Sequence, residues 1–191
     1  MPDPASFTDE ENWSGGFYEL SIELGDLDHQ GLQRALTALW RAASIDGCYG
    51  SRDHEPGEQA EVPCTVSSLA TFGHLRGTVH LPNGHRVVCG CVILGGDEDP
   101  EWLDFYLPLG ALARVDPRIG GFPFDSRSGE DSLVWRRPLD DWLAAVGTTI
   151  FREVPFRLGL IGFETERRHL LRTARRHRTG TALGGISAAG W

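Results

Sequence analysis

A predicted β-hairpin over residues 74–94 constrains the fold more than any other part of the sequence. Two runs rich in valine, leucine and isoleucine flank Asn83-Gly84 in HLRGTVHLPNGHRVVCGCVIL. Asn-Gly is strongly favoured in two-residue hairpin turns, because both of its residues tolerate a positive φ. If these two residues form the whole turn, Pro82 pairs with His85, and this pairing sets the register of both strands.

The register decides on which face of the hairpin the two cysteines lie. Directly opposed residues share a face, so Cys89 would lie opposite Thr78, and Cys91 opposite Arg76. The cysteines would then belong to the more polar side of the sheet. A slip of one residue would move every side chain of one strand to the other face, so this assignment depends on the length of the turn.

Further segments show the period of two that is typical of half-buried strands. Residues 17–24 and 102–107 alternate between apolar and polar side chains, and residues 156–164 form a last apolar strand. Residues 132–136 are short and apolar enough to be interpreted as another strand. These segments do not alternate strictly with helices, so a doubly wound parallel sheet is not expected.

Two segments have the apolar spacing of amphipathic helices. Residues 26–44 carry apolar side chains at every third or fourth position, and residues 138–154 begin with a proline at a typical first helical position. Residues 46–64 have no period and are interpreted as a long loop, a kind of segment that is often functional. We therefore expect an α+β fold in two layers, with a mainly antiparallel sheet of about five to six strands and helices packed on one face.

The charge distribution suggests one domain with two distinct ends. The chain of 191 residues has a formal net charge of −9, and the segment from Glu166 onward carries six arginines against one glutamate. We expect residues 1–12 to be a flexible N-terminus, residues 13–165 a single domain, and residues 166–191 a basic, disordered tail. The acidic body disfavours nucleic acid, except through the basic tail.

The composition indicates a cytoplasmic protein of a bacterial type. All 18 basic residues are arginines, as is expected for a GC-rich genome, and the acidic start of the chain does not resemble a secretory signal. No apolar run approaches the roughly 18 residues of a membrane span, so no membrane association is expected. The four cysteines should be reduced in the cytoplasm.

The sheet face turned away from the helices is predicted to bind the ligand. It should combine polar and aromatic side chains on an open surface, which the long loop over residues 46–64 would cover. The predicted ligand-binding residues are Glu19, Glu23, His74, Arg76, Thr78, His80, Cys89, Cys91, Trp102, Asp104 and Tyr106.

Two functions are compatible with such a face. The first is a non-catalytic binding protein that takes up a small molecule or a protein partner, a second copy of the chain included. The second is a small enzyme that uses a cysteine nucleophile with histidine and arginine, or a carboxylate with histidine. The spacing of the cysteines matches no zinc signature and the chain contains no Walker A sequence, so neither a metal nor another cofactor is expected.

Overall fold

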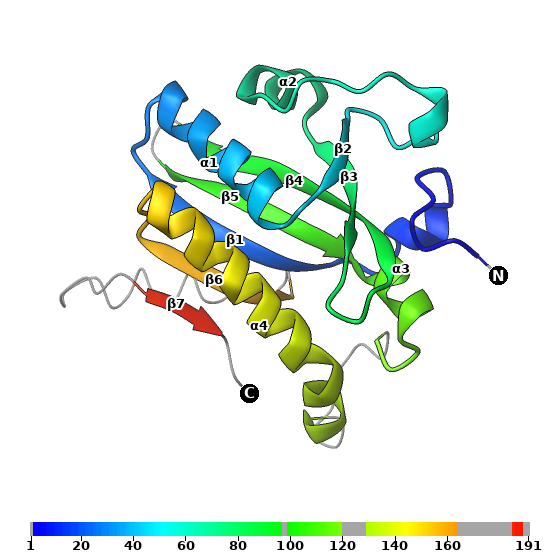
Figure 1. Ribbon diagram of the computed structural model, residues 1–191. Helices are drawn as coiled ribbons and strands as arrows, with labels where there is room; N and C mark the ends of the chain where they lie inside the picture. Colours follow the sequence, from blue (N-terminus) through cyan, green and yellow to red (C-terminus); the bar gives the residue numbers. More distant parts are fainter. Residues whose placement is uncertain (1, 97–98, 120–128, 164–184, 189–191) are drawn as a thin grey trace.

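A computed structural model describes residues 2–96, 99–119, 129–163 and 185–188 (Figure 1). The strands are β1 (Phe17–Gly25), β2 (Asp46–Tyr49), β3 (Leu75–His80), β4 (Arg86–Gly96), β5 (Asp99–Pro108), β6 (Leu158–Phe163) and β7 (Gly185–Ala188). The helices are α1 (His29–Ala42), α2 (Val66–Phe72), α3 (Leu109–Val115) and α4 (Gly129–Glu153), with 3₁₀ turns η1 (Glu10–Trp13) and η2 (Pro56–Glu58). The described strands form one sheet in the order β2-β3-β4-β5-β1-β6-β7. All neighbours pair antiparallel except β7, which runs parallel to β6.

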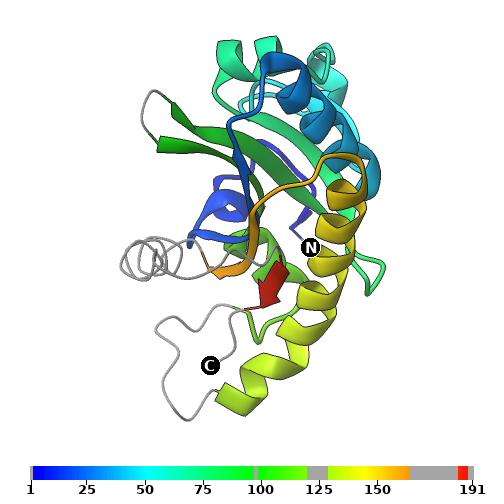
Figure 2. The same cartoon turned by 90° about the vertical axis from the view of Figure 1, so that its left-hand side faces the viewer.

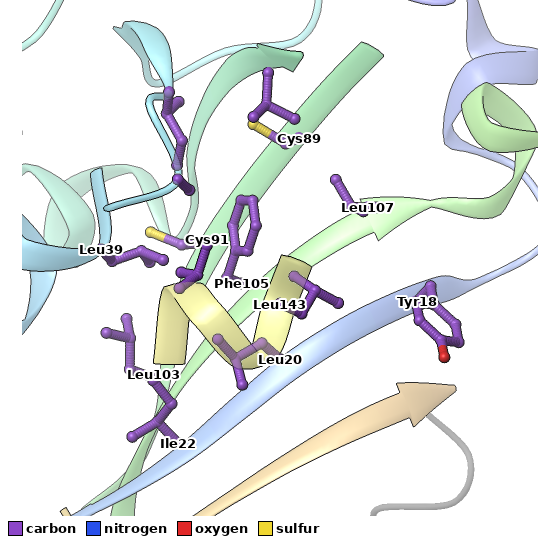
Figure 3. Packing of buried hydrophobic residues seen from close by; sticks show 14 of the residues in the cluster. Tyr18, Leu20, Ile22, Leu39, Cys89, Cys91, Leu103, Phe105, Leu107 and Leu143 are labelled. Atoms are coloured by element: carbon purple, nitrogen blue, oxygen red, sulfur yellow. The ribbon is translucent and has the colours of Figure 1, made fainter. Parts of the chain in front are cut away.

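The two longest helices, α1 and α4, cover one face of the sheet (Figure 2). Between sheet and helices lie apolar side chains such as Leu20 and Phe105 from the sheet, Leu39 from α1 and Leu143 from α4 (Figure 3). The expected two-layer α+β fold is therefore confirmed. None of the described helices is both long and apolar enough to cross a membrane.

Helix α1 forms where its apolar period predicts it. The Asp28 carboxylate accepts a hydrogen bond from the backbone N–H of Gly31 at 2.7 Å, and so caps the first turn. Helix α4 differs from the prediction, because it begins nine residues before Pro138, at Gly129. The strand predicted for residues 132–136 is wrong, since these residues are helical.

The buried stripe of α4 explains why the helix continues past its proline. Trp135, Leu139 and Leu143 follow one another at intervals of four residues and are all buried. A proline inside a helix removes one backbone hydrogen bond and costs about 3 kcal/mol. Burial of large apolar side chains on both sides of Pro138 contributes about 1.5–3 kcal/mol each and outweighs that cost.

The turn of the β3–β4 hairpin is one residue longer than predicted. Leu81 donates its backbone N–H to the carbonyl of His85 at 2.8 Å, and Gly84 donates to the carbonyl of Leu81 at 2.8 Å. The loop therefore comprises residues 82–84, with Gly84 at φ +84°. Pro82 has no N–H to donate, so it cannot close a two-residue turn as a hydrogen-bonded pair with His85.

The longer turn shifts the register by one residue. Cys91 lies opposite Leu75, and Cys89 lies opposite Gly77. The predicted pairs with Arg76 and Thr78 are therefore wrong. Both cysteines point toward the helices and belong to the hydrophobic core (Figure 3).

The segment between α1 and α2 is more structured than a plain loop. It begins with the edge strand β2 and contains the turn η2. Glu55, just before η2, accepts hydrogen bonds from the hydroxyls of Ser6 and Thr8, each at 2.6 Å, and from the backbone N–H of Phe7 at 3.0 Å. Phe7 is 1% exposed, so the N-terminal segment, which we expected to be flexible, packs against the body of the protein.

The basic tail over residues 166–191 lies outside the described residues, apart from β7. For residues 185–188 the expectation of disorder differs from the structure, in which these residues pair with Leu158–Ile161 of β6.

Candidate functional site

The sheet face opposite α1 and α4, here called the polar face, carries most of the predicted ligand-binding residues. The register of β1, β3, β4 and β5 places alternate residues of each strand on this face. Only Cys89 and Cys91 lie on the other side. The predicted residues that the polar face brings together are Glu19, Glu23, His74, Arg76, Thr78, His80, Trp102, Asp104 and Tyr106.

The polar face is much less open than predicted. Asp104 is 2% exposed, Tyr106 is 4% exposed and Trp102 is 6% exposed. His80, near the hairpin turn, is exposed. Charged and polar side chains with so little contact with water need partners within the protein, and the polar face provides two groups of them.

The acidic group lies along β1. Ser21 donates its hydroxyl to the carboxylate of Glu19 at 3.2 Å, and Arg157 lies 3.3 Å from the carboxylate of Glu23. Asp104 is the cross-strand neighbour of Ser21 on β5. The buried carboxylates on β1 are therefore engaged by neighbouring side chains.

The second group begins with His74 and Tyr106. The hydroxyl of Tyr106 lies 2.9 Å from Nδ1 of His74. In the sheet, Gly90 lies between Arg76 on β3 and Tyr106 on β5. A Cβ atom at position 90 would lie 2.4 Å from the hydroxyl oxygen of Tyr106. The tyrosine therefore crosses β4 at a position that has no side chain to obstruct it.

Two arginines complete this group around a tryptophan of the N-terminal segment. The guanidinium carbons of Arg52 and Arg76 each lie 5.9 Å from the centroid of the Trp13 ring. Arg76 donates one Nη to the carbonyl of Gly50 at 2.7 Å, whereas its buried Nε has no hydrogen-bond partner among the described residues. Neither arginine forms an ion pair within the described part of the chain. We call Trp13, Arg52, His74, Arg76 and Tyr106 the arginine–aromatic cluster.

The electrostatics of the cluster are those of a positively charged site. Burial, together with the charges of Arg76 and Arg52, lowers the pKa of His74 below its ordinary value of 6.5. Burial raises the pKa of the Tyr106 hydroxyl, and the same two arginines oppose this rise. At neutral pH the histidine is therefore neutral and the tyrosine is protonated, so the positive charge resides on the two guanidinium groups.

Two members of the cluster were not among the predicted site residues. Trp13 is the last residue of η1, directly after residues 1–12, which were expected to be flexible, and Arg52 belongs to the long segment between α1 and α2. The one signal that pointed to Arg52 was the length of that segment, since long loops in compact domains are often functional. No periodicity indicates that both residues meet Arg76.

The cysteines on β4 do not contribute to the site. Cys89 and Cys91 are each 0% exposed, and burial raises the pKa of both thiols. A thiolate beside Arg76, as the cysteine version of the enzyme hypothesis requires, is contradicted by this placement. Within the described residues, no group of three or more histidine, cysteine, aspartate or glutamate side chains is arranged to hold a metal ion.

The chain was compared with protein-family models, with curated proteins and with solved structures, and none of them matches it. A function for this chain therefore has to be inferred from the arginine–aromatic cluster and its surroundings. The cluster places two guanidinium groups against one indole ring in a protein whose net charge is −9.

Proposed function

We propose that this chain is a non-catalytic binding protein, and that its ligand presents an anionic group to the arginine–aromatic cluster. The ligand is a small molecule or an acidic side chain of a protein partner. The observation that carries this proposal is the buried Nε of Arg76, which has no hydrogen-bond partner among the described residues. A buried donor left without a partner costs about 1–3 kcal/mol, and an anion is the acceptor that would satisfy it best.

The arrangement of charge supports an anionic ligand. Two guanidinium groups approach the same indole ring, although like charges repel each other. No carboxylate of the described residues forms an ion pair with either of them. Guanidinium groups bind carboxylates and phosphates through paired N–H donors, so an anion bound to Arg76 would supply the missing acceptor and offset the like charges of the two arginines.

Three side chains of the cluster are already held in position within the protein. Tyr106 and His74 hold each other through their hydrogen bond, and Arg76 is fixed by its bond to the carbonyl of Gly50. Side chains that are already held in position lose little conformational entropy when a ligand binds. The cluster therefore offers preorganised donors, which is what a binding site requires.

A catalytic role has less support. The thiols of Cys89 and Cys91 lie on the core side of the sheet, so the cluster lacks the nucleophile that the enzyme hypothesis assigned to them. A carboxylate with a histidine stays the alternative. For His74 this role requires contact with an acid, whereas the hydrogen-bond partner of His74 within the described chain is the neutral hydroxyl of Tyr106.

The test is calorimetric titration of the purified protein with inorganic phosphate, with citrate and with a hexaglutamate peptide, each against sodium chloride at equal ionic strength. The matched pair of variants is Arg76→Met and Arg34→Met. Arg34 is an exposed residue of α1, on the helical side of the sheet, so both changes remove one positive charge and only the first removes a donor of the cluster.

We expect at least one of the three anions to bind, and the Arg76→Met variant to bind it roughly tenfold or more weakly, since a hydrogen bond to a charged group contributes about 1.5–3 kcal/mol. The Arg34→Met variant should retain the affinity of the original chain. If all three anions bind both variants equally, or if none binds the original protein, the cluster is not an anion site and the proposal is wrong.

A further inference from the structure

Cys48 and Cys64 lie at the two ends of the segment that carries Arg52. Cys48 belongs to the edge strand β2, and Cys64 precedes α2 by two residues. The backbone N–H of Val62 donates to the carbonyl of Cys48 at 2.8 Å, which brings the end of the segment back beside its beginning. Both cysteines are free thiols.

The side chain of Gln33 on α1 fixes the position of Cys64. Its Nε2 donates to the carbonyl of Cys64 at 3.0 Å, and its Oε1 accepts from the backbone N–H of Val66 at 3.0 Å. The Cys64 side chain therefore packs against the same hydrophobic core to which Cys48 belongs. The backbone contacts on both sides hold the two cysteines close together.

The two thiols differ in their surroundings. Cys48 is 5% exposed, whereas Cys64 is only partly buried. Contact with the Cys64 thiol, together with burial and the nearby charge of Glu61, raises the pKa of the Cys48 thiol. Oxidants attack thiolates that are accessible to solvent, so Cys64 is the thiol that reacts first.

We propose that Cys48 and Cys64 are a redox pair that forms a disulfide when the chain meets a peroxide. In the first step the Cys64 thiolate attacks hydrogen peroxide, becomes a sulfenic acid and releases hydroxide. In the second step the Cys48 sulfur attacks the sulfenic sulfur, the S–S bond forms, and the sulfenic oxygen leaves as water with the thiol proton. Each sulfur loses one electron and the peroxide gains two.

The disulfide would close the segment between Cys48 and Cys64, which carries Arg52 and Glu55. Glu55 holds the N-terminal segment through Ser6 and Thr8. Oxidation would therefore restrict both segments from which Arg52 and Trp13 of the arginine–aromatic cluster arise. An effect on ligand binding rests on the proposed function, whereas formation of the disulfide does not.

The experiment exposes the purified full chain to a small excess of hydrogen peroxide without any ligand and measures its intact mass. The free thiols are then alkylated in denaturant and the peptides are mapped. We expect a mass loss of about 2 Da, a peptide that joins Cys48 to Cys64, and Cys89 and Cys91 as free thiols. The thermal midpoint should rise by roughly 6 to 12 °C, because a loop of this length is closed. The matched variants are Cys64→Ser, which should show neither change, and Cys89→Ser, which should still form the disulfide.

Two results would overturn the proposal. One is a Cys64→Ser variant that still loses about 2 Da on oxidation, because another pair would then be responsible. The other is a wild-type protein in which Cys64 is oxidised to sulfinic acid while Cys48 stays a thiol. Because Cys64 is only partly buried, its serine variant should fold, and a thermal midpoint equal to that of the reduced wild type verifies this. No ligand is present, so the outcome is independent of the anion titrations.

Discussion

The hydroxyl of Tyr106 lies 2.9 Å from Nδ1 of His74, and it reaches this position by crossing the backbone of Gly90. This hydrogen bond spans three neighbouring strands, since His74 precedes β3, Gly90 lies in β4 and Tyr106 lies in β5. A hydrogen bond between an imidazole and a phenol at this distance fixes the orientation of both rings. The cluster therefore depends on a residue that has no side chain.

Replacement of Gly90 by alanine should displace Tyr106. The new Cβ would lie 2.4 Å from the hydroxyl oxygen and 2.5 Å from Cζ of the tyrosine, so the ring has to move and its bond to His74 is lost. Overpacking of this kind costs about 1–3 kcal/mol, which urea denaturation at constant m value would measure. The control is Gly57→Ala, because a Cβ at position 57 meets nothing within 4 Å. Equal loss of stability in both variants would show that Tyr106 does not lie over Gly90.

The titration of His74 should depend on Arg76. Burial lowers the pKa of His74 below 6.5, and the charges of Arg76 and Arg52 lower it further. The Arg76→Met variant should therefore show a higher pKa for His74, although not the full ordinary value, because burial and Arg52 remain. Proton NMR of the histidine ring signals as a function of pH would measure this, and Arg34→Met should leave the pKa unchanged. An unchanged pKa in the Arg76→Met variant would place the guanidinium away from His74.

The same lowered pKa has a consequence for stability. The unfolded chain binds a proton at His74 at a higher pH than the folded chain does, so it binds more protons in the window between the two pKa values. The free energy of unfolding therefore rises with pH through that window, whose upper limit is the ordinary value of 6.5. The lowered pKa of His74 therefore destabilises the folded state at acidic pH. This loss in the free energy of unfolding should be smaller in the Arg76→Met variant.

The faces of individual strands could be predicted from the sequence, because the alternation of side chains is a property of each strand alone. Glu19 and Asp104 lie on the predicted face for this reason, as neighbours of Tyr106 and Ser21 in the sheet. The faces within the hairpin depended on its turn. In the hairpin, the missing N–H of Pro82 favoured a loop of three residues instead of two. The one additional loop residue shifts the register, so the cysteines lie in the core and not on the polar face.

The composition of the site was harder to predict, because it depends on contacts between distant segments. Arg52 and Trp13 reach Arg76 through folding of two irregular segments, and no local period reports such a contact. Glu55 is a clear case, since its hydrogen bonds join residues 47 to 49 positions apart in the chain. Charged residues are common in solvated loops, so the presence of a glutamate in a loop does not indicate that it bonds to a distant segment.

Loss of the Glu55 charge should release the N-terminal segment. Burial raises the pKa of Glu55, but the hydrogen bonds from Ser6, Thr8 and Phe7 prevail and lower it from 4.5 to about 2. The stabilisation is therefore complete above pH 4.5 and is lost as the pH falls from 4.5 to about 2. Because the carboxylate is partly exposed, we expect Glu55→Gln to cost only about 1 kcal/mol.

Hydrogen exchange at the backbone amides of Phe7 and Thr8 would measure this release most directly, because both amides donate to Glu55. Exchange should become faster in the Glu55→Gln variant at neutral pH. The control is Glu10→Gln, which neutralises an exposed acid in η1 of the same segment. If both variants protect the two amides equally, Glu55 does not hold the segment.

Removal of the Tyr18 hydroxyl should weaken the attachment of α4 to the sheet. Tyr18 on β1 is 0% exposed, donates its hydroxyl to the carboxylate of Asp140 and accepts from Nε of Arg136 at 3.2 Å. Burial raises the pKa of Asp140, and the bond from Tyr18 opposes this rise. In the Tyr18→Phe variant the pKa of Asp140 should therefore rise further, and the free energy of unfolding should fall by about 1–3 kcal/mol.

Tyr49→Phe is the matched control, because the Tyr49 ring is buried while its hydroxyl donates at 3.3 Å to Glu61, which is exposed. Water can replace that bond, so this variant should lose less than 1 kcal/mol. Urea denaturation at pH 7 would compare the two. A Tyr18→Phe variant as stable as Tyr49→Phe would mean that apolar packing alone attaches α4 to β1, since the ring of Tyr18 is retained in the variant and only its hydroxyl is removed.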